Sequence, residues 1–186
     1  QLCLSNPEVL NIAVRNVRKY FDTDPDRDSY SLSPDDNPWF CECAECRALN
    51  SGEMMDVWTK PVPVVTDRVL WFSNRVCEEV LRTHPGKLFG LHVYHSYTPL
   101  PARERPHPNL VLWVCHHTPA CYAHTIDDPT CPENVKFNDY LRGWCAMGNK
   151  IVVYAYVYKS VCDHLLWPME RIKSNSPSVF AQTFWP

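Results

Sequence analysis

Carboxylates, imidazoles and aromatic rings gather at four places along the chain, each directly after a short apolar or alternating run. These places contain Asp35, Asp36 and Trp39; Tyr94 and His95; His116 and His117; and Tyr154 and Tyr156. Aspartate, histidine and tyrosine can hydrogen-bond hydroxyl groups, and aromatic rings can stack on the apolar face of a pyranose ring. Because ligands bind at the carboxyl ends of parallel strands, these residues predict a sugar site at one rim of a sheet.

Hydrolysis of a glycosidic bond places further demands on this rim. It needs two carboxyl groups about 5 to 5.5 Å apart for retention of configuration, or about 6.5 to 9.5 Å apart for inversion. Asp35 and Asp36 are adjacent, so in an extended chain they point to opposite sides and do not form that pair. We expect one of them to be catalytic, with Asp36 as general acid or substrate-orienting carboxylate. The alternative is that Asp-Asp-Asn after Pro34 forms an ordinary turn.

The histidines allow two other interpretations. His92 falls in the middle of an expected strand, where a histidine is typically a hydrogen-bonded core residue. A metal-dependent site could combine His95, His116 and His117 with a carboxylate. Adjacent residues of a strand point apart, however, so His116 and His117 are poor partners for one ion.

The ten cysteines fall mostly into two groups. Cys41, Cys43 and Cys46 form a C-x-C-x2-C pattern, and Cys3 could supply the fourth ligand of a structural zinc ion. Disulfides are the alternative if the protein is exported, and free thiols are a third. In the second group, Cys121 and Cys131 are close enough in sequence for a local bridge.

Elements that alternate between strand-like and helical patterns must position these residues. Helical spacing predicts helices over 7–21, 66–83 and 132–147, and apolar or alternating runs predict strands over 29–33, 87–94, 109–115 and 150–158. Residues 1–4 could end a preceding strand. Near-continuous apolar runs are typical of strands covered on both faces. Segment 35–63 has little periodicity, and four prolines predict a helix-free crossover over 94–109.

Length and composition limit both the fold and the function. A full eight-fold barrel needs about 250 residues, and the chain has 186. The pattern therefore predicts an α/β fold of parallel βα units, as part of a (β/α)8 barrel or as a small open sheet. A net charge of −3 and the lack of a basic block disfavour nucleic acid as a partner. No apolar run approaches the ~18 residues of a membrane span.

Several sequence blocks resemble an uncharacterised bacterial family, domain of unknown function four-eight-three-eight. The blocks are 1–9, 31–36, 40–49, 67–74, 108–110, 131–134 and 141–144, together with Tyr94. The resemblance covers most of residues 1 to about 173. It implies a glycoside-hydrolase-like TIM barrel, usually within a larger exported protein, and hence a secreted or periplasmic location. We accordingly expect a barrel domain over 1–175 and a tail over 176–186.

The resemblance also assigns individual positions. Asp36 matches an acidic residue after the first strand, Tyr94 a strand-end tyrosine and His124 a histidine after the third strand. Ala155 stands where the family commonly has aspartate, which weakens a two-carboxylate mechanism. The expected sugar-binding residues are Trp39, Tyr94, His95, His117, His124, Tyr154 and Tyr156.

The resulting expectation is a glycosidase-like domain that acts on or binds carbohydrate and hydrolyses O-glycosyl bonds. It requires no cofactor beyond the candidate structural zinc. A non-catalytic carbohydrate-binding or scaffold domain is the alternative. Because open sheet edges invite association, a homo-oligomer or the remainder of a larger chain is an expected partner.

Overall fold

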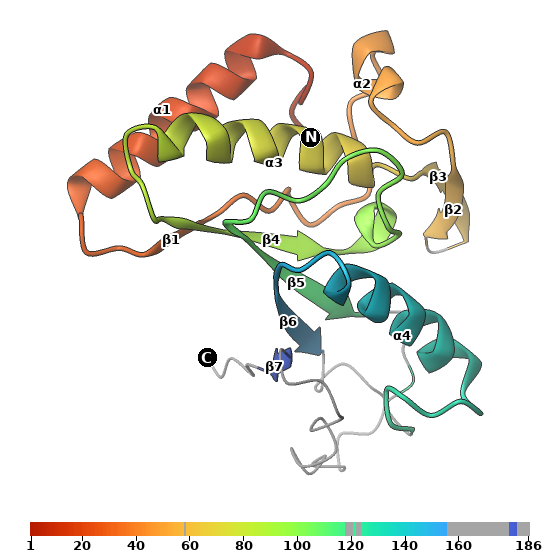
Figure 1. The fold of residues 1–186 in the computed structure, drawn as a ribbon. Coiled ribbons are helices and arrows are strands. Elements are labelled where there is room, and N and C mark those ends of the chain that lie inside the picture. The colour runs from red at the N-terminus through yellow and green to blue at the C-terminus, as the bar shows by residue number, and fades with distance from the viewer. Residues whose placement is uncertain (58, 118–120, 122–123, 156–178, 182–186) are drawn as a thin grey trace.

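A parallel sheet organises the chain (Figure 1). The computed structural model describes residues 1–57, 59–117, 121, 124–155 and 179–181. The elements in chain order are α1 (Pro7–Thr23), β1 (Ser29–Ser31), α2 (Ala44–Ala48), β2 (Met54–Val57), β3 (Lys60–Pro63), α3 (Thr66–Leu81), β4 (Leu88–Val93), the 3-10 turn η1 (His95–Tyr97), β5 (Leu110–His116), α4 (Pro132–Cys145), β6 (Lys150–Ala155) and β7 (Val179–Ala181). The predicted α/β class and its main helices and strands are confirmed.

The sheet is wound in one direction. Its order is β1-β4-β5-β6-β7, with all neighbours parallel, so strands follow one another in space as they do in the chain. Right-handed crossovers in such a sheet place every helix on the same face. One core cluster accordingly contains Val17 of α1, Val76 of α3 and Trp144 of α4 together with Leu112 of β5.

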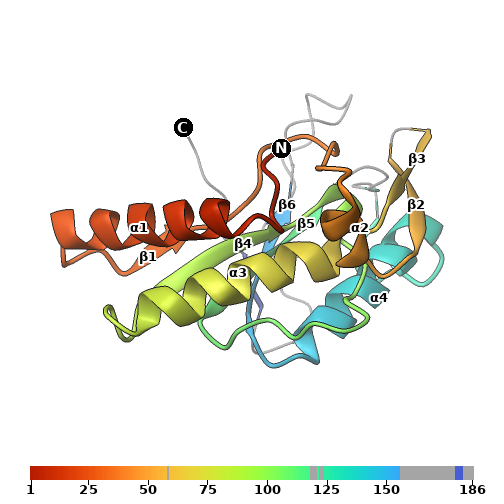
Figure 2. The same cartoon turned by 90° about the horizontal axis from the view of Figure 1, so that it is seen from above.

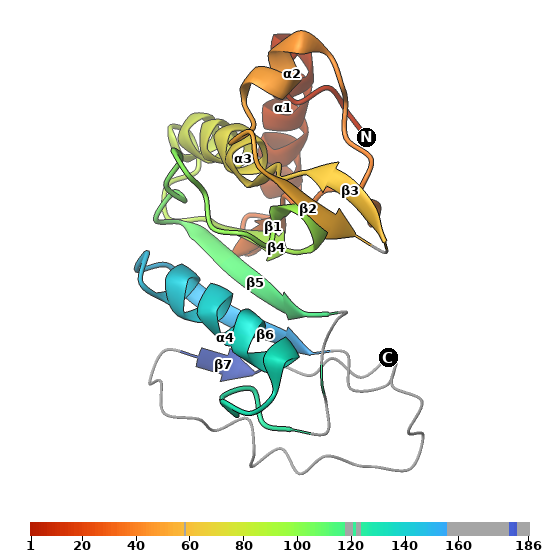
Figure 3. The same cartoon turned by 90° about the vertical axis from the view of Figure 1, so that its right-hand side faces the viewer.

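The sequence predicted strands covered on both faces, but in the described part of the chain the helices lie on one face of the sheet only. Figure 2 shows α1 and α3 side by side over β4, and Figure 3 shows α4 against the β5–β6 part of the sheet. Strand residues that face these helices, such as Leu91 and Val114, are buried, whereas His92, Trp113 and Tyr154 on the other face are half-buried. The apolar runs arise because half-buried aromatic residues alternate with buried aliphatic ones.

The helix boundaries follow from local chemistry. The Asn6 side chain caps α1 by accepting a 2.8 Å hydrogen bond from the Glu8 amide, and Pro7 occupies the first turn, where its missing N–H has no cost. The helix then buries Val14, Val17 and Phe21. No strand precedes it, so the expected strand end at residues 1–4 is wrong.

Segment 35–63 holds two elements that its irregular pattern did not predict. The five-residue helix α2 begins after Cys43, and β2 and β3 form an antiparallel hairpin. The hairpin strands have four residues each, and β3 contains Pro61 and Pro63. Such short, proline-containing strands carry too little alternation to be recognised.

The crossover segment, residues 94–109, contains η1 but no regular helix, as predicted. Side chains of the flanking helices hold its backbone. The Asp67 carboxylate accepts hydrogen bonds from the three successive amides of 102–104, at 2.8 to 3.1 Å. Asn74 accepts from the His107 amide at 2.9 Å, and the Trp144 indole donates to the Thr98 carbonyl at 2.9 Å.

The C-terminal part of the chain is described only in places. β6 ends at Ala155, and the expected strand residues 156–158 lie outside the described residues. β7 pairs with β6 inside the segment expected to be a tail, and the domain boundary at 175 stays a prediction. No helix in the described part of the chain combines the length and the apolar character needed to cross a membrane.

Candidate functional site

The ends of β4 and β5 bring three predicted site residues together. Tyr94 follows β4, and its hydroxyl lies 3.3 Å from Nε2 of His117, which follows β5. The ring centroid of His95 lies 3.7 Å from that of Tyr94 and 5.2 Å from that of His117. Since β4 and β5 are parallel neighbours, their carboxyl ends meet at one edge. We call these three residues and Asp36 the rim cluster.

His95 is the most constrained member of the rim cluster. Its φ of 45° lies in the left-handed region, which is unfavourable for a residue with a side chain. Its ring is almost fully buried, and this burial lowers the pKa of His95 to about 4, helped by His117 and opposed by Asp36. The imidazole is therefore neutral at pH 7 and can both donate and accept a hydrogen bond.

Asp36 completes the rim cluster from the loop after β1. Its Oδ1 lies 3.7 Å from His95 Nε2, while 85% of the Asp36 side chain is exposed. An exposed carboxylate next to an imidazole can accept hydrogen bonds from the hydroxyl groups of a ligand at this edge of the sheet.

The other residues of this loop have turn contacts. The Asn37 side chain accepts a 3.1 Å hydrogen bond from the Trp39 amide, so the turn chemistry predicted for this stretch lies at Asn37. The Gln1 side chain donates to the carbonyl oxygens of Asp35 and Asn37, at 2.9 and 3.1 Å. The Asp35 and Trp39 side chains are exposed beside the rim.

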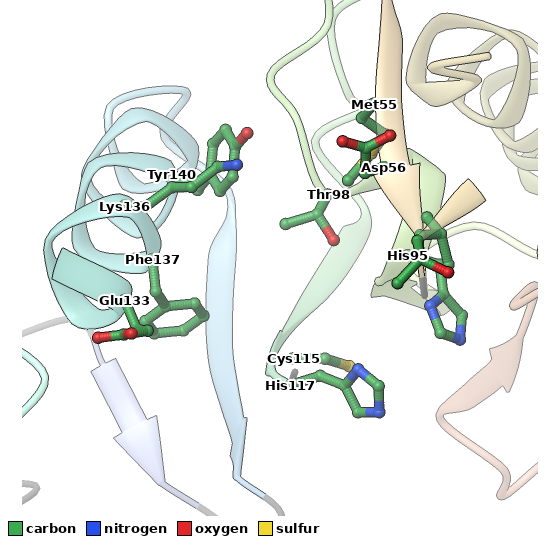
Figure 4. Close-up of a pocket in the computed structure, with 12 residues that line it drawn as sticks. Met55, Asp56, His95, Thr98, Cys115, His117, Glu133, Lys136, Phe137 and Tyr140 are labelled. Atoms are coloured by element: carbon green, nitrogen blue, oxygen red, sulfur yellow. The ribbon is translucent and has the colours of Figure 1, made fainter. Parts of the chain in front are cut away.

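A cavity of about 370 Å³ opens beside His95 and His117, between the β2–β3 hairpin and α4 (Figure 4). This volume is typical of a small-molecule site. Aromatic side chains and carboxylates line it together. The lining residues are Met55, Asp56, Val57, Thr59, His95, Thr98, Cys115, His117, Glu133, Lys136, Phe137 and Tyr140.

Two carboxylates of this cavity were not predicted. Asp56 belongs to β2, and Glu133 lies in the first turn of α4. In Figure 4 they come from opposite walls. An acidic residue in the first turn of a helix is usually explained by the helix dipole, so Glu133 did not indicate a site. Asp56 falls in the segment without periodicity, so its place in the fold was not predicted.

Two predicted sugar-binding residues, His124 and Tyr154, do not join the rim cluster. Tyr154 lies with His92 and Trp113, at ring-centroid distances of 5.6 and 6.5 Å, and lines a separate cavity of about 490 Å³. His124 lines neither of these cavities, and its Nδ1 lies 2.6 Å from Asp128 in the loop before α4. Tyr156 lies outside the described residues.

The adjacent histidines point apart, as predicted. His116 is buried, with Nε2 3.0 Å from Asn134 Oδ1, whereas His117 faces Tyr94. His95, His116 and His117 therefore do not form a metal centre. Among the described residues, ligand atoms of three or more histidine, cysteine or acidic side chains converge in one place only, and that group consists of cysteines.

The four-cysteine group comprises Cys3, Cys41, Cys43 and Cys46, whose Sγ atoms all lie within 4.8 Å of one another. Cys3 Sγ is 3.7 Å from the Sγ atoms of both Cys43 and Cys46. A disulfide needs about 2.05 Å, and the four thiols are free. The ligand set predicted for a structural metal is thus assembled in the described fold and could bind a metal ion.

The comparison with protein families concerns nearly the whole chain. A family model described as "Domain of unknown function (DUF4838)" matches residues 1–175. The chain belongs to the DUF4838 family. The match includes the rim cluster, the cavity residues and the four-cysteine group, so all of these are features of the family's domain as it occurs in this chain. Neither the curated proteins nor the solved structures include a match to the chain.

The positive charge of Arg68 lies next to the four-cysteine group. Arg68 is 2% exposed, its Nη1 donates to the Cys41 carbonyl at 2.7 Å, and its Nε donates to Asn50 at 2.9 Å. Burial lowers the pKa of Arg68, and Coulomb interactions with all four cysteines oppose that change. The segment that carries Cys41, Cys43 and Cys46 is therefore anchored to α3 by a buried cation.

The second cysteine pair precedes α4. Cys121 and Cys131 are free thiols, and burial raises the pKa of Cys131, with a further contribution from its interaction with Cys121. The Asn134 side chain holds the same loop by contacts with the amide and carbonyl of Cys121. A Cys121–Cys131 disulfide stays a prediction.

Proposed function

We propose that the chain is a glycoside-hydrolase-like domain that binds carbohydrate at the rim cluster and in the adjoining cavity. The observation that carries this proposal is the convergence of Asp36, Tyr94, His95 and His117 beside a cavity that also holds Phe137 and Tyr140. Sugars need this combination, because hydroxyl groups require polar partners in several directions while ring faces require apolar surface.

The scaffold supports the same proposal. A parallel sheet wound in one direction, with the long helices of the described residues on one face, matches the arrangement of successive βα units in a (β/α)8 barrel. In such barrels the substrate lies at the carboxyl ends of the strands, where the rim cluster lies here. We therefore propose that the sheet is part of a barrel of that kind.

Binding can be tested with a panel of oligosaccharides and isothermal titration calorimetry. Tyr94→Phe removes a hydrogen-bonding hydroxyl group and Asp36→Asn replaces a charged carboxylate by a neutral amide. Each should weaken binding by about 10- to 100-fold, the equivalent of one hydrogen bond to a charged or buried group. His124→Gln is the matched control, because His124 lines neither cavity, and it should bind as the wild type does. Equal affinity in all four proteins would remove the rim cluster from the site.

Hydrolysis is the second candidate function, favoured by the carboxylates of Asp56 and Glu133 on opposite walls of the cavity. Asp36 orients the sugar in this scheme, and Asp56 and Glu133, which are exposed like Asp36, supply the acid and its partner. Asp56→Asn and Glu133→Gln should each lower turnover of a glycoside panel by at least 100-fold with little loss of affinity. Binding without turnover in the wild-type protein would leave the non-catalytic carbohydrate-binding function.

A further inference from the structure

We propose that the four-cysteine group binds one Zn²⁺ ion, and that this ion fixes the N-terminal segment, residues 1–5, against the loop that carries Asp36. Among redox-inert metal ions, Zn²⁺ is the one best suited to four thiolate ligands in a tetrahedral arrangement. The proposal has two parts. Metal binding stands by itself, whereas the value of fixing Asp36 rests on the proposed function.

The sulfur positions fit a tetrahedron of the size that zinc requires. With Zn–S bonds of about 2.3 Å, neighbouring sulfur atoms of a tetrahedral site lie about 3.8 Å apart. Cys3 Sγ lies 3.7 Å from two of its partners, and all separations in the group are below 4.8 Å. The four atoms therefore need to move by less than about 1 Å to coordinate one ion.

The surroundings compensate the charge of such a site. Four thiolates and one Zn²⁺ carry a net charge of −2, which is costly in a partly buried place without a counter-charge. Arg68 supplies a buried cation, and in the described part of the chain no carboxylate forms an ion pair with it. The Ser5 hydroxyl lies 3.2 to 3.7 Å from three of the sulfur atoms and can donate to a thiolate.

The chain path explains why an ion here would position the rim. Cys3 precedes α1, and the other three ligands follow the loop after β1, so the ion would join segments separated by about 40 residues. Gln1 lies two residues before Cys3 and donates to the carbonyl oxygens of Asp35 and Asn37 on either side of Asp36. Residues 1–5 therefore link the ligand set to the Asp36 loop.

The first experiment measures metal binding directly. The full chain, purified under reducing conditions and reconstituted with Zn²⁺, should hold one zinc per chain by elemental analysis. Replacement by Co²⁺ should give the visible d–d bands and the sulfur-to-cobalt charge-transfer bands of a tetrahedral thiolate site. Cys43→Ser should lose both signals, whereas Cys145→Ser, on the partly exposed α4, should keep them. A reconstituted wild-type protein with no bound zinc or with octahedral cobalt spectra overturns the proposal.

The second experiment tests the role of Arg68 with a readout other than folding. Competition with a chromophoric chelator should show that Arg68→Met weakens zinc binding by about 10- to 100-fold, as expected for an outer partner of a metal site. Arg68→Lys keeps the charge and should recover part of that loss. Equal zinc affinity in the wild type and both variants contradicts the charge argument.

The third experiment tests the link to the rim. Removing zinc with a chelator should speed hydrogen exchange in residues 1–5 and 34–46 and leave the central strand β5 unchanged. Zinc binding with unaltered exchange in 34–37 would confirm the metal site and contradict its link to Asp36. If the zinc site is confirmed but no sugar binds, the proposed function fails while the metal site stands.

Discussion

At the scale of single residues, His95 combines an unfavourable backbone conformation with a buried neutral imidazole. Its pKa of about 4 in the folded chain compares with about 6.5 for a free histidine. Because the folded state binds the proton more weakly, this contribution to stability is fully present above pH 6.5. It decreases as the pH falls from 6.5 towards 4.

This difference gives a measurable pH dependence. At pH 5 the wild-type protein should have lost about 2 kcal/mol of its free energy of unfolding through His95 alone. His95→Asn, whose side chain tolerates the left-handed backbone, should lose correspondingly less between pH 7.5 and pH 5. Urea unfolding of both proteins at the two pH values measures the effect. The difference in free energy of unfolding between the two proteins at pH 7.5 gives the part of the substitution's effect that does not depend on protonation of His95. An identical pH dependence in the two proteins contradicts the assignment.

The sequence correctly predicted that residues following neighbouring parallel strands lie close together. Tyr94, His95 and His117 meet because they follow neighbouring parallel strands, and strand ends are readable from apolar runs. Tyr154 sits on the other face because successive strand residues alternate, and the run that contains it does not reveal which face the helices cover. Asp56 and Glu133 could not be found, because only the tertiary approach of the hairpin to α4 brings them to one cavity.

At the scale of elements, α4 is attached to the crossover segment through Trp144, which is 1% exposed and donates to the Thr98 carbonyl. Trp144→Phe leaves that carbonyl without its partner and creates a small cavity, so it should lower the free energy of unfolding by about 1–3 kcal/mol. Urea unfolding measures this. Trp39→Phe, at a position 64% exposed, is the control and should change stability by less than about 0.5 kcal/mol. Equal stability of Trp144→Phe and the wild type would contradict the anchoring role.

The long helices were predictable because each repeats its apolar face over several turns, and α1 in addition begins at a recognisable side-chain cap, Asn6. The α2 helix and the β2–β3 hairpin were not. Both are short, and their positions depend on contacts with distant parts of the chain, including Cys3 near the N-terminus. Local propensity carries little information in elements of four or five residues.

At the scale of the whole molecule, one hydrophobic core joins α1, α3 and α4 to a single face of the sheet. We therefore expect the described domain to unfold in one cooperative transition. Far-UV circular dichroism and the fluorescence of the seven tryptophans, which include the buried Trp144, should give coincident urea curves. A fluorescence transition that precedes loss of helicity would contradict a single cooperative transition.

The sequence predicted parallel βα units, and the family resemblance pointed to a barrel. The sheet order and the common helix face are consistent with such units, but periodicity alone could not fix that order. Hydrophobic patterns identify strands without specifying their neighbours. The strand order is known only from the pairing in the structure, such as Leu91 opposite Leu112 and Val114 opposite Val153.

The way Asp67 holds the crossover segment has an evolutionary consequence. The Asp67 carboxylate accepts hydrogen bonds from the three backbone amides of 102–104. The path of that segment therefore depends on one helix residue and on backbone N–H groups, which every amino acid except proline possesses. The exposed Ala102 side chain can therefore vary without altering the path, whereas the Glu104 side chain also accepts a 3.2 Å hydrogen bond from Asn74. The Ala102 position of the crossover can accordingly take new side chains during evolution while the sheet that supports the crossover stays unchanged.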